Sequence, residues 1–300
     1  MHDSLRATEA DSRLAEVTIL VVSYNSGGVL EACLRSVPPA ARLVVVDNAS
    51  SDGSAALATR LAPWAQVIRA PENLGFGRAA NLGFAGATTR YGLLLNADTR
   101  CTPGMVEALL DAAERYPEAG LLAPRIATPD GGLQFGHLPI LERHRRRGTP
   151  MPPEGDCCAP YVGGAAMFFP LSAFRAIGGF DPDIFLYYED DDICMRMRRS
   201  GRTLVHVHAA RLEHGSGQSS APSAKVTRGK EWHMGWSRQH MLRKYRGPAV
   251  AALQGGLLLA ELATRLALCR GDPRRGKWVA RLEGTLAALR GRSATAAGIR

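Results

Sequence analysis

The sequence predicts an α/β fold, with a mainly parallel sheet flanked by helices and a helical extension toward the C-terminus. Two observations indicate this fold class. Short, continuous apolar runs rich in β-branched residues alternate with segments of helical spacing between residues 17 and 98, and such runs are typical of strands buried on both faces. Each run also ends at a polar or glycine-rich cluster. This alternation favours parallel strands joined by helices.

The elements of the first half follow in a regular order. We expect strands over residues 17–22, 43–46, 66–69 and 91–95, and helices over 29–37, after Gly53, and over 79–87. Ligands bind at the carboxyl ends of the strands in such sheets. We therefore expect the polar side chains at these ends to converge on one crevice, and they are Ser23, Tyr24, Asn25, Asp47, Asn48, Asn73, Asn96 and Asp98.

The second half is less regular. Residues 137–156 are rich in Pro, Arg and Gly and are expected to form an exposed excursion. A strand is expected over 161–169, a helix over 193–200 and a late strand over 203–207. The sequence shows no internal repeat.

Asp98 is a candidate metal ligand. It ends a predicted buried strand, and a carboxylate there offers the hard oxygen that Mg²⁺ or Mn²⁺ favours when it bridges phosphate oxygens. The alternative is a helix N-cap, the commoner role of an Asp after an apolar run. His214, which follows the late strand, is either a structural histidine or a second ligand.

Asp47 ends the second predicted strand in the same way. Its carboxylate could bind the base or ribose of a ligand, or it could cap the following helix. Residues 50–52 could supply that cap instead, so the ligand role is favoured.

Four consecutive acids, residues 189–192, lie between apolar segments. Carboxylates that repel one another and lose hydration have raised pKa values, and a carboxylate tuned in this way can act as a general base toward a hydroxyl. A helix N-terminus would account for one or two acids through the macrodipole, but hardly for four. We therefore expect chemistry at this cluster.

Together these motifs resemble glycosyltransferase family 2 over roughly residues 16–245. The matching segments, in the family's order, are residues 21–25, 46–53, 72–77 with Asn81, 96–98, 178–181 and 188–192. The Asn-Leu-Gly-Phe-Gly segment at 73–77 and the Glu-Asp-x-Asp cluster at 189–192 are most similar to the rhamnosyltransferase branch of cell-wall and O-antigen assembly. The resemblance implies a GT-A fold, the nucleotide-diphospho-sugar transferase fold.

The resemblance also implies a role for each matching residue. The donor would be bound by Ser23, Tyr24, Asn25, Asp47, Asn73, Gly75, Asn81, Asn96 and Ala97, and a Mg²⁺ or Mn²⁺ ion by Asp98 and His214. The catalytic base would be Asp190, supported by Glu189 and Asp192, and the acceptor loop would be Gly163, Gly164 and Ala165. Asn96 departs from the family's first DXD aspartate, which weakens the expected metal site.

The implied reaction is an inverting sugar transfer without a covalent intermediate. Asp190 would take a proton from the acceptor hydroxyl, whose oxygen would displace the nucleoside diphosphate. The implied donor is a nucleotide-diphosphate sugar, with dTDP-rhamnose favoured, and the acceptor is a glycan or polyprenyl-linked glycan of cell-surface polysaccharide synthesis. The implied domains are a disordered lead-in (1–15), a GT-A catalytic domain (16–245) and a basic helical extension (246–300).

Composition indicates the class of protein and its cellular compartment. Hydrophobic residues make up 46% of the chain and charged residues 22%, which is ordinary for a soluble globular protein. The six cysteines lack metal-ligand spacing and suit a reducing cytoplasm.

The excess of positive charge, +9 overall, is concentrated in the tail, where residues 265–300 hold nine Lys or Arg and two acids. Residues 249–269 are mostly apolar, but Gln254, Glu261 and Arg265 make them a poor transmembrane span. The tail is expected either to lie on an anionic membrane surface, at the inner face of the cytoplasmic membrane, or to pack on the catalytic domain.

Two other classes fit parts of the sequence. Residues 75–80 match the GxGxxA fingerprint of an NAD(P)-dependent oxidoreductase, but that fingerprint normally follows the first strand. A basic nucleic-acid-binding protein is suggested by charge alone, without aromatic interleaving or a known motif. We therefore expect no nucleic-acid partner.

Overall fold

The computed structural model describes residues 11–128, 132–134, 138–142, 153–215 and 223–295. Most of the predicted excursion, residues 137–156, and the first ten residues of the predicted lead-in lie outside these ranges. Residues 11–14 form a helical turn that buries Leu14 in the core. The prediction of disorder is therefore wrong for this part of the lead-in, because an apolar side chain anchors it.

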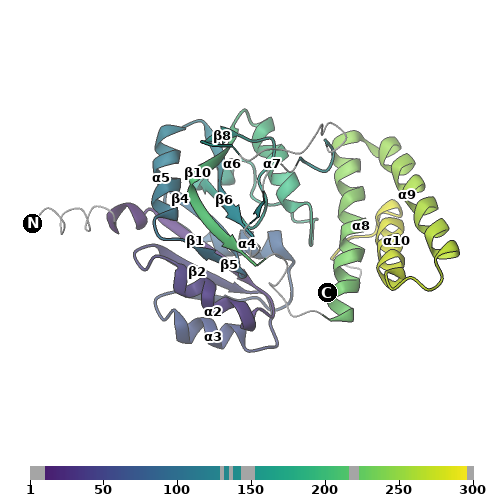
Figure 1. Ribbon diagram of the computed structural model, residues 1–300, viewed down its shortest axis with the longest axis horizontal. Coiled ribbons are helices and arrows are strands. Elements are labelled where there is room, and N and C mark those ends of the chain that lie inside the picture. The colour runs from purple at the N-terminus through teal and green to yellow at the C-terminus, as the bar shows by residue number, and fades with distance from the viewer. Residues whose placement is uncertain (1–10, 129–131, 135–137, 143–152, 216–222, 296–300) are drawn as a thin grey trace, which may run out of the picture.

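The first half of the chain forms parallel strands joined by helices, as predicted (Figure 1). The strands are β1 (Val17–Ser23), β2 (Arg42–Asp47), β3 (Gln66–Arg69) and β4 (Tyr91–Asn96). The connecting helices are α2 (Gly27–Ser36), α3 (Ser54–Leu61) and α4 (Phe76–Ala85). Strand β1 pairs in parallel with both β2 and β4, so the carboxyl ends of these three strands lie at one edge of the sheet.

The second half turns the sheet into a mixed one. Its strands are β5 (Thr99–Cys101), β6 (Ala119–Ala127), β7 (Leu133–Gln134), β8 (Cys157–Cys158), β9 (Ala166–Pro170) and β10 (Thr203–His214). The order along the sheet is β3-β2-β1-β4-β9-β6-β10-β5, and β9 runs antiparallel to both of its neighbours. The fold class is confirmed as α/β, with a parallel half and a mixed half in which β6 and β10 pair in parallel.

Helices cover both faces of the sheet, which explains why its strands are apolar without alternation. Odd residues of β1, such as Ile19 and Val21, pack with α2 and with α5 (Met105–Arg115). Even residues, such as Leu20 and Val22, pack with α4 and α6 (Leu171–Ala176). Each fully buried Val, Leu or Ile contributes about 1.5–3 kcal/mol relative to exposure.

Three C-terminal helices form a separate layer beside the sheet (Figure 1). They are α8 (Ala224–Arg246), α9 (Pro248–Leu268) and α10 (Arg275–Leu289). Helix α8 packs along both α9 and α10, and Trp232 and Trp236 of α8 share a cluster with Phe185 of the α/β part. Helix α8 therefore joins the sheet layer to the helical extension.

Some element boundaries differ from the prediction. Residues 161–165 form a loop before β9 rather than a strand, and β10 continues to His214 rather than ending near residue 207. Helix α7 (Glu189–Arg199) begins within the acidic cluster, four residues before its predicted start. The macrodipole of α7 favours acids in this first turn, so the helix-terminus interpretation of the cluster also holds.

Candidate active site

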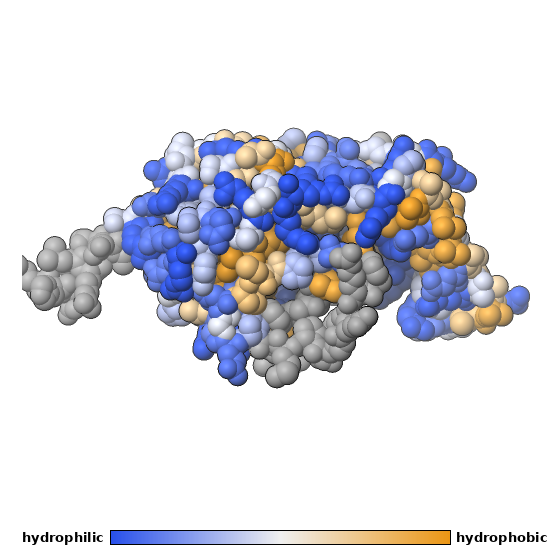
Figure 2. Space-filling view, turned by 90° about the horizontal axis from the view of Figure 1, so that it is seen from above, coloured by the Kyte–Doolittle hydropathy of each residue, from blue (hydrophilic) through white to orange (hydrophobic). Residues whose placement is uncertain are grey.

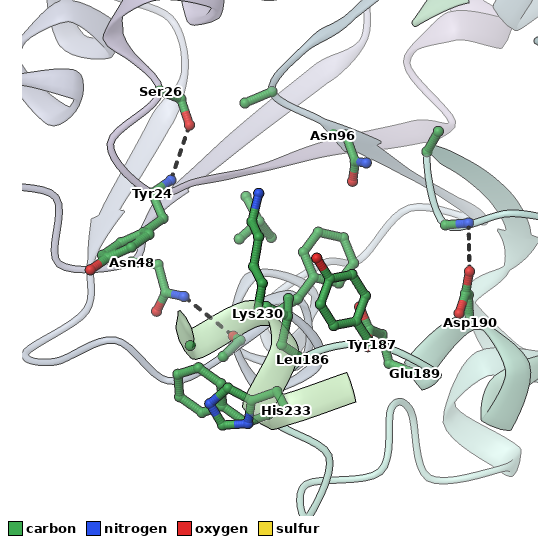
Figure 3. Close-up of a pocket in the computed structure, with 18 of the residues that line it drawn as sticks. Tyr24, Ser26, Asn48, Asn96, Leu186, Tyr187, Glu189, Asp190, Lys230 and His233 are labelled. Carbon is green, nitrogen blue, oxygen red and sulfur yellow. Dashed lines mark hydrogen bonds between the residues drawn. The ribbon is translucent and has the colours of Figure 1, made fainter. Parts of the chain in front are cut away.

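The strand ends meet as the sequence predicted. Ser23 pairs with Asp47 across β1 and β2, and Val22 pairs with Asn96 across β1 and β4. A cavity of about 610 Å³ opens at this edge, between the sheet and helix α8 (Figure 3). The predicted site residues that line it are Tyr24, Asn73, Gly75, Asn96, Ala97, Gly163, Gly164, Ala165, Glu189, Asp190 and His214.

Other predicted site residues lie beside the cavity rather than on its wall, and they are Ser23, Asn25, Asp47, Asn81, Asp98 and Asp192. Asn81 has its amide committed to the chain, because its Nδ2 donates to the Phe180 carbonyl at 2.9 Å and its Oδ1 accepts from the Phe180 amide at 2.8 Å. These bonds give Asn81 a structural role in holding the loop before α7.

Asp47 is almost fully buried, at 4% exposure. Its Oδ2 accepts a hydrogen bond from the Ser50 amide at 3.2 Å, so it stabilises the turn that follows β2. Its Oδ1 is buried without a hydrogen-bond partner among the described residues. Burying an oxygen without a hydrogen bond costs free energy. A ligand group that donates a hydrogen bond to Oδ1 would remove this cost.

One end of the cavity is built from neutral polar side chains. Tyr24, Ser26 and Asn48 lie there (Figure 3). Asn48 donates from Nδ2 to Asn73 Oδ1 at 2.9 Å and accepts at Oδ1 from the Leu74 amide at 2.8 Å, so it fixes the loop that closes this end. An aromatic ring beside amide and hydroxyl groups suits a nucleoside, which offers a flat base and a ribose.

Gly75 in this loop is required by a close approach. Its φ is +83°, and a Cβ at this position would lie 2.3 Å from the Phe185 carbonyl oxygen. The amide of Phe76 donates to the same oxygen at 3.0 Å. The glycine of the GxGxxA match therefore serves contact between two loops, which removes the main support for a dinucleotide fingerprint.

Asp98 and His214 lie together at the sheet edge. The Asp98 Oδ1 and the His214 Nε2 are 3.4 Å apart, and both side chains are largely buried. This separation exceeds an ordinary hydrogen bond and is close to the spacing of about 3.0–3.4 Å between adjacent ligands with bonds of about 2.0–2.2 Å to one ion. His214 Nδ1 is 3.3 Å from Gln134 Oε1, which can fix the ring. The two side chains thus fit a divalent cation.

A second group could also bind a cation by geometry. Ligand atoms of Asp181, Asp183 and His240 lie within 4.8 Å of one another. However, the Lys244 ammonium is 2.5 Å from Asp181 Oδ2, and His240 Nε2 is 3.1 Å from the same oxygen. These contacts hold the pKa of Asp181 well below its usual range, against the effect of burial. A protein cation already neutralises this group.

The Asp190 carboxylate lies at the end of the cavity opposite Tyr24 (Figure 3). Its Oδ2 accepts bonds from the Tyr161 hydroxyl and from the Gly164 amide, at 3.2 Å for the latter, and its Oδ1 accepts from the Asp191 amide at 2.9 Å. Burial and the Asp190 charge raise the pKa of Tyr161, so its hydroxyl remains a donor. A carboxylate has about four lone-pair sites, and one remains for a substrate proton.

Glu189 lies beside Asp190 in the first turn of α7. Burial and the neighbouring Asp190 carboxylate raise the pKa of Glu189 to about 8, so Glu189 is mainly neutral at pH 7. Tyr187 and Tyr188, just before it, both have positive φ, 68° and 67°. Such backbone is unfavourable for non-glycine residues and collects at functional sites. Here it turns the chain into the first turn of α7.

Asp192 has a different role, because it is fully buried below the cavity wall. Its carboxylate contacts the Lys244 ammonium at 2.6 Å, the Tyr245 hydroxyl at 2.7 Å and the Arg196 guanidinium at 2.7 Å. Lys244 and Tyr245 belong to α8. Asp192 therefore fastens α8 to the acidic helix α7, and breaking one partner of such a buried pair is costly.

Sequence reasoning missed one wall of the cavity. It predicted no element over residues 224–246, where α8 contributes Lys225, Val226, Gly229, Lys230 and His233 to the lining. It also missed Tyr161, the hydrogen-bond partner of Asp190. Two signals were available, the N-cap Ser223, which accepts from the Val226 amide at 3.1 Å, and the Gly247-Pro248 break at the other end.

Comparison with known proteins agrees with this geometry. Residues 18–172 match the family described as Glycosyl transferase family 2, and the chain belongs to this family. It is a glycosyltransferase, and neither the oxidoreductase nor the nucleic-acid-binding alternative is supported.

Among its relatives is an N-acetylglucosaminyl-diphospho-decaprenol L-rhamnosyltransferase of Mycobacterium tuberculosis. The two chains are 29% identical over 305 residues, which cover 87% of this chain and 97% of the relative. A pre-mycofactocin glycosyltransferase of the same organism is 28% identical, over 66% of this chain and 42% of its own length.

Solved structures confirm the GT-A fold. The mannosyltransferase PcManGT from Pyrobaculum calidifontis, in complex with GDP-Man and Mn²⁺, has a TM-score of 0.53 and 16% identity, with 91% of this chain and 87% of that chain covered. TarS 1-349 of S. aureus in complex with UDP has a TM-score of 0.54 and 13% identity, with 92% and 90% covered.

Proposed function

We propose that this enzyme transfers rhamnose from dTDP-rhamnose to a hydroxyl of a polyprenyl-linked glycan, with inversion of the anomeric configuration. One observation carries the proposal, namely a single cavity with a nucleoside-type wall at one end and the Asp190 carboxylate at the other. The similarity to a rhamnosyltransferase that acts on a decaprenol-linked sugar, over 97% of that relative, supports the choice of sugar and acceptor.

The mechanism follows from the proposed roles of the residues. Tyr24 and Asn73, with Asn48, bind the nucleoside, while Gly163, Gly164 and Ala165 border the acceptor. Asp190 takes the proton of the acceptor hydroxyl, and that oxygen attacks the anomeric carbon as the bond to the nucleoside diphosphate breaks. The bonds from Tyr161 and the Gly164 amide hold the carboxylate in place for this transfer.

Asp98 and His214 would hold a Mg²⁺ or Mn²⁺ ion in this proposal. The ion supplies positive charge that stabilises the departing diphosphate. We also assign residues 16–245 to the catalytic domain and 246–300 to the helical extension, and α8 of the catalytic domain packs on α9 and α10 of the extension.

A donor screen tests the proposed function. Purified enzyme is incubated with a GlcNAc-diphospho-polyprenol acceptor, Mn²⁺ and one of several nucleotide sugars, and the product is analysed by mass spectrometry and NMR. We expect product from dTDP-rhamnose, with inverted anomeric configuration, and at least about tenfold less from UDP-glucose and GDP-mannose, because one unpaired polar contact costs about 1.4 kcal/mol or more. Equal use of all donors, or a retained configuration, would contradict the proposal.

We further propose that α9 lies in the surface of an anionic membrane, which gives access to a lipid-linked acceptor. Among the described residues, α9 is the one helix long and apolar enough to cross a membrane, and only 17% of its apolar window is buried. Leu253 and Leu257 are 66% and 63% exposed, and apolar residues gather at this end of the molecule (Figure 2).

The opposite side of α9 packs through Ala251, Gly255 and Leu262. A helix packed on one side and apolar on the other favours a position in the membrane plane over a span. Exposed basic residues at the ends of this layer, such as Arg243, Arg270 and Lys277, would attract anionic lipid headgroups.

Replacement of both exposed leucines is expected to weaken membrane binding. The double variant Leu253→Glu/Leu257→Glu should bind vesicles of phosphatidylglycerol and phosphatidylcholine at least about tenfold more weakly in sedimentation assays, because it removes apolar area and adds repulsion. Nucleotide affinity should not change, because neither leucine lines the cavity. Leu82→Glu, at a leucine of α4 that is 37% exposed, is the matched control. Equal sedimentation of both variants would exclude this surface.

A further inference from the structure

Lys230 extends from α8 into the cavity and is not used by the mechanism above. Figure 3 places its side chain between the end with Tyr24 and Asn48 and the side chain of Asn96. Lys230 is half-buried, and no described carboxylate forms an ion pair with it. By contrast, Lys244 contacts two carboxylates. A lysine withdrawn from bulk water is seldom left without an anion.

The orientation of Lys230 is fixed by the packing of α8. Val226, Gly229, Lys230 and His233 line the cavity at the i, i+3, i+4, i+7 spacing of one helix face. The other side of the helix is fastened to α10, since Glu231 pairs with Arg281 at 2.5 Å.

Close contact between the backbones of α8 and α10 also fixes the orientation of α8. A Cβ at Gly284 of α10 would lie 2.0 Å from the Trp232 carbonyl oxygen, so the two helices touch backbone to backbone. Helix α8 cannot rotate without losing these contacts, and Lys230 therefore keeps facing the cavity.

Charge is distributed unevenly along the cavity. The Tyr24 end carries neutral polar groups, the far end carries the Asp190 carboxylate beside Glu189, and the Lys230 ammonium lies between them (Figure 3). A nucleotide sugar has the same order of parts, with a neutral nucleoside, then a dianionic diphosphate, then the sugar, which would face the proposed catalytic base Asp190. The one part of this ligand that matches a cation in the middle is the diphosphate.

We propose that Lys230 is a protein-borne subsite for the donor diphosphate that acts independently of a divalent cation. This inference rests on the proposed function. In the transfer step the anomeric carbon–oxygen bond breaks and its electron pair passes to the β-phosphate oxygen, while the acceptor proton passes to Asp190. Lys230 would neutralise part of the charge that develops on the departing diphosphate.

The test separates the diphosphate from the nucleoside and from the metal. Binding of dTDP and of thymidine is measured calorimetrically in EDTA for wild type, Lys230→Met and Lys230→Arg. Lys277→Met, which removes an exposed lysine of α10, is the matched control. We expect Lys230→Met to bind dTDP about 10- to 100-fold more weakly, the usual effect of losing one charge-assisted bond. Thymidine affinity should not change, and Lys230→Arg should recover most of the dTDP affinity.

The possible outcomes are distinct. If wild type and Lys230→Met bind dTDP equally, the subsite is wrong while the proposed function stands. If Lys230→Met keeps dTDP affinity and raises only the KM for the polyprenyl diphosphate acceptor, Lys230 binds the acceptor diphosphate and the inference is also wrong. If wild type binds no nucleoside diphosphate with or without Mn²⁺, the proposed function fails together with the inference.

Discussion

The Asp190→Asn variant is expected to bind dTDP with wild-type affinity and to transfer sugar about 10²- to 10⁴-fold more slowly, the usual contribution of a positioned general base. An amide has the shape of the carboxylate but cannot take up the acceptor proton. The affinity is expected to persist because Asp190 lies at the opposite end of the cavity from Tyr24 and Asn48. The measurements are single-turnover transfer and calorimetric dTDP binding.

Two neighbouring acids serve as controls for this prediction. Glu189→Gln should retain most activity at pH 7, because Glu189, with a pKa of about 8, is already mainly neutral there. Asp192→Asn should instead lower the thermal stability, because Asp192 is buried against Lys244, Tyr245 and Arg196. If Asp190→Asn were active and Glu189→Gln were folded but inactive, the catalytic base would be Glu189 and not Asp190. Activity in all three variants would refute single displacement at this cluster.

Asp98→Ala is expected to remove the effect of divalent cations on nucleotide binding. Loss of a direct ligand should weaken Mn²⁺ binding in the presence of dTDP by more than the 10- to 100-fold that outer partners of a metal site contribute. Asp98→Asn should keep the packing of this buried side chain with a poorer ligand, and His214→Ala should show a milder defect. The measurements are calorimetric dTDP binding with and without Mn²⁺, and circular dichroism to establish folding.

Asp183→Asn is the control that separates the two candidate cation groups. Asp183 is an exposed member of the Asp181–Asp183–His240 group, which already contacts Lys244. We expect its replacement to leave Mn²⁺-dependent dTDP binding unchanged. If Asp183→Asn lost the Mn²⁺ effect and Asp98→Ala kept it, the ion would bind at the Asp181–Asp183–His240 group. That result would overturn the assignment to Asp98.

The parallel half of the sheet and the convergence of its loops follow from local sequence patterns. Apolar runs such as 17–22 are typical of strands buried on both faces of a parallel sheet, and parallel pairing brings the ends of β1, β2 and β4 to one edge. This is why Tyr24 and Asn96 could be expected in one cavity before any contact was known, whereas Asp190 was expected there only from the family resemblance. The motifs of the family lie on these local elements.

The contacts of the side chains near that edge depend instead on how distant segments pack together. Asn81 and Asp192 lie in segments that match the family motifs, as several cavity-lining residues do. Nevertheless, Asn81 bonds to the Phe180 backbone and Asp192 forms an ion pair with Lys244 of α8. Both partners lie far away in the sequence, at 99 and 52 positions. Local spacing determines the element on which a residue lies, but a polar side chain takes the partner that the packed chain brings within reach.

The placement of Lys230 also depends on packing between segments that are distant in the sequence. The period of α8 can indicate a helix, but the face that lines the cavity is fixed by its contacts with α10, including the close approach of Gly284 to Trp232. These contacts form only when residues about fifty positions apart pack together. The sequence therefore determined which groups meet at the strand ends, whereas long-range packing decided which cation faces them.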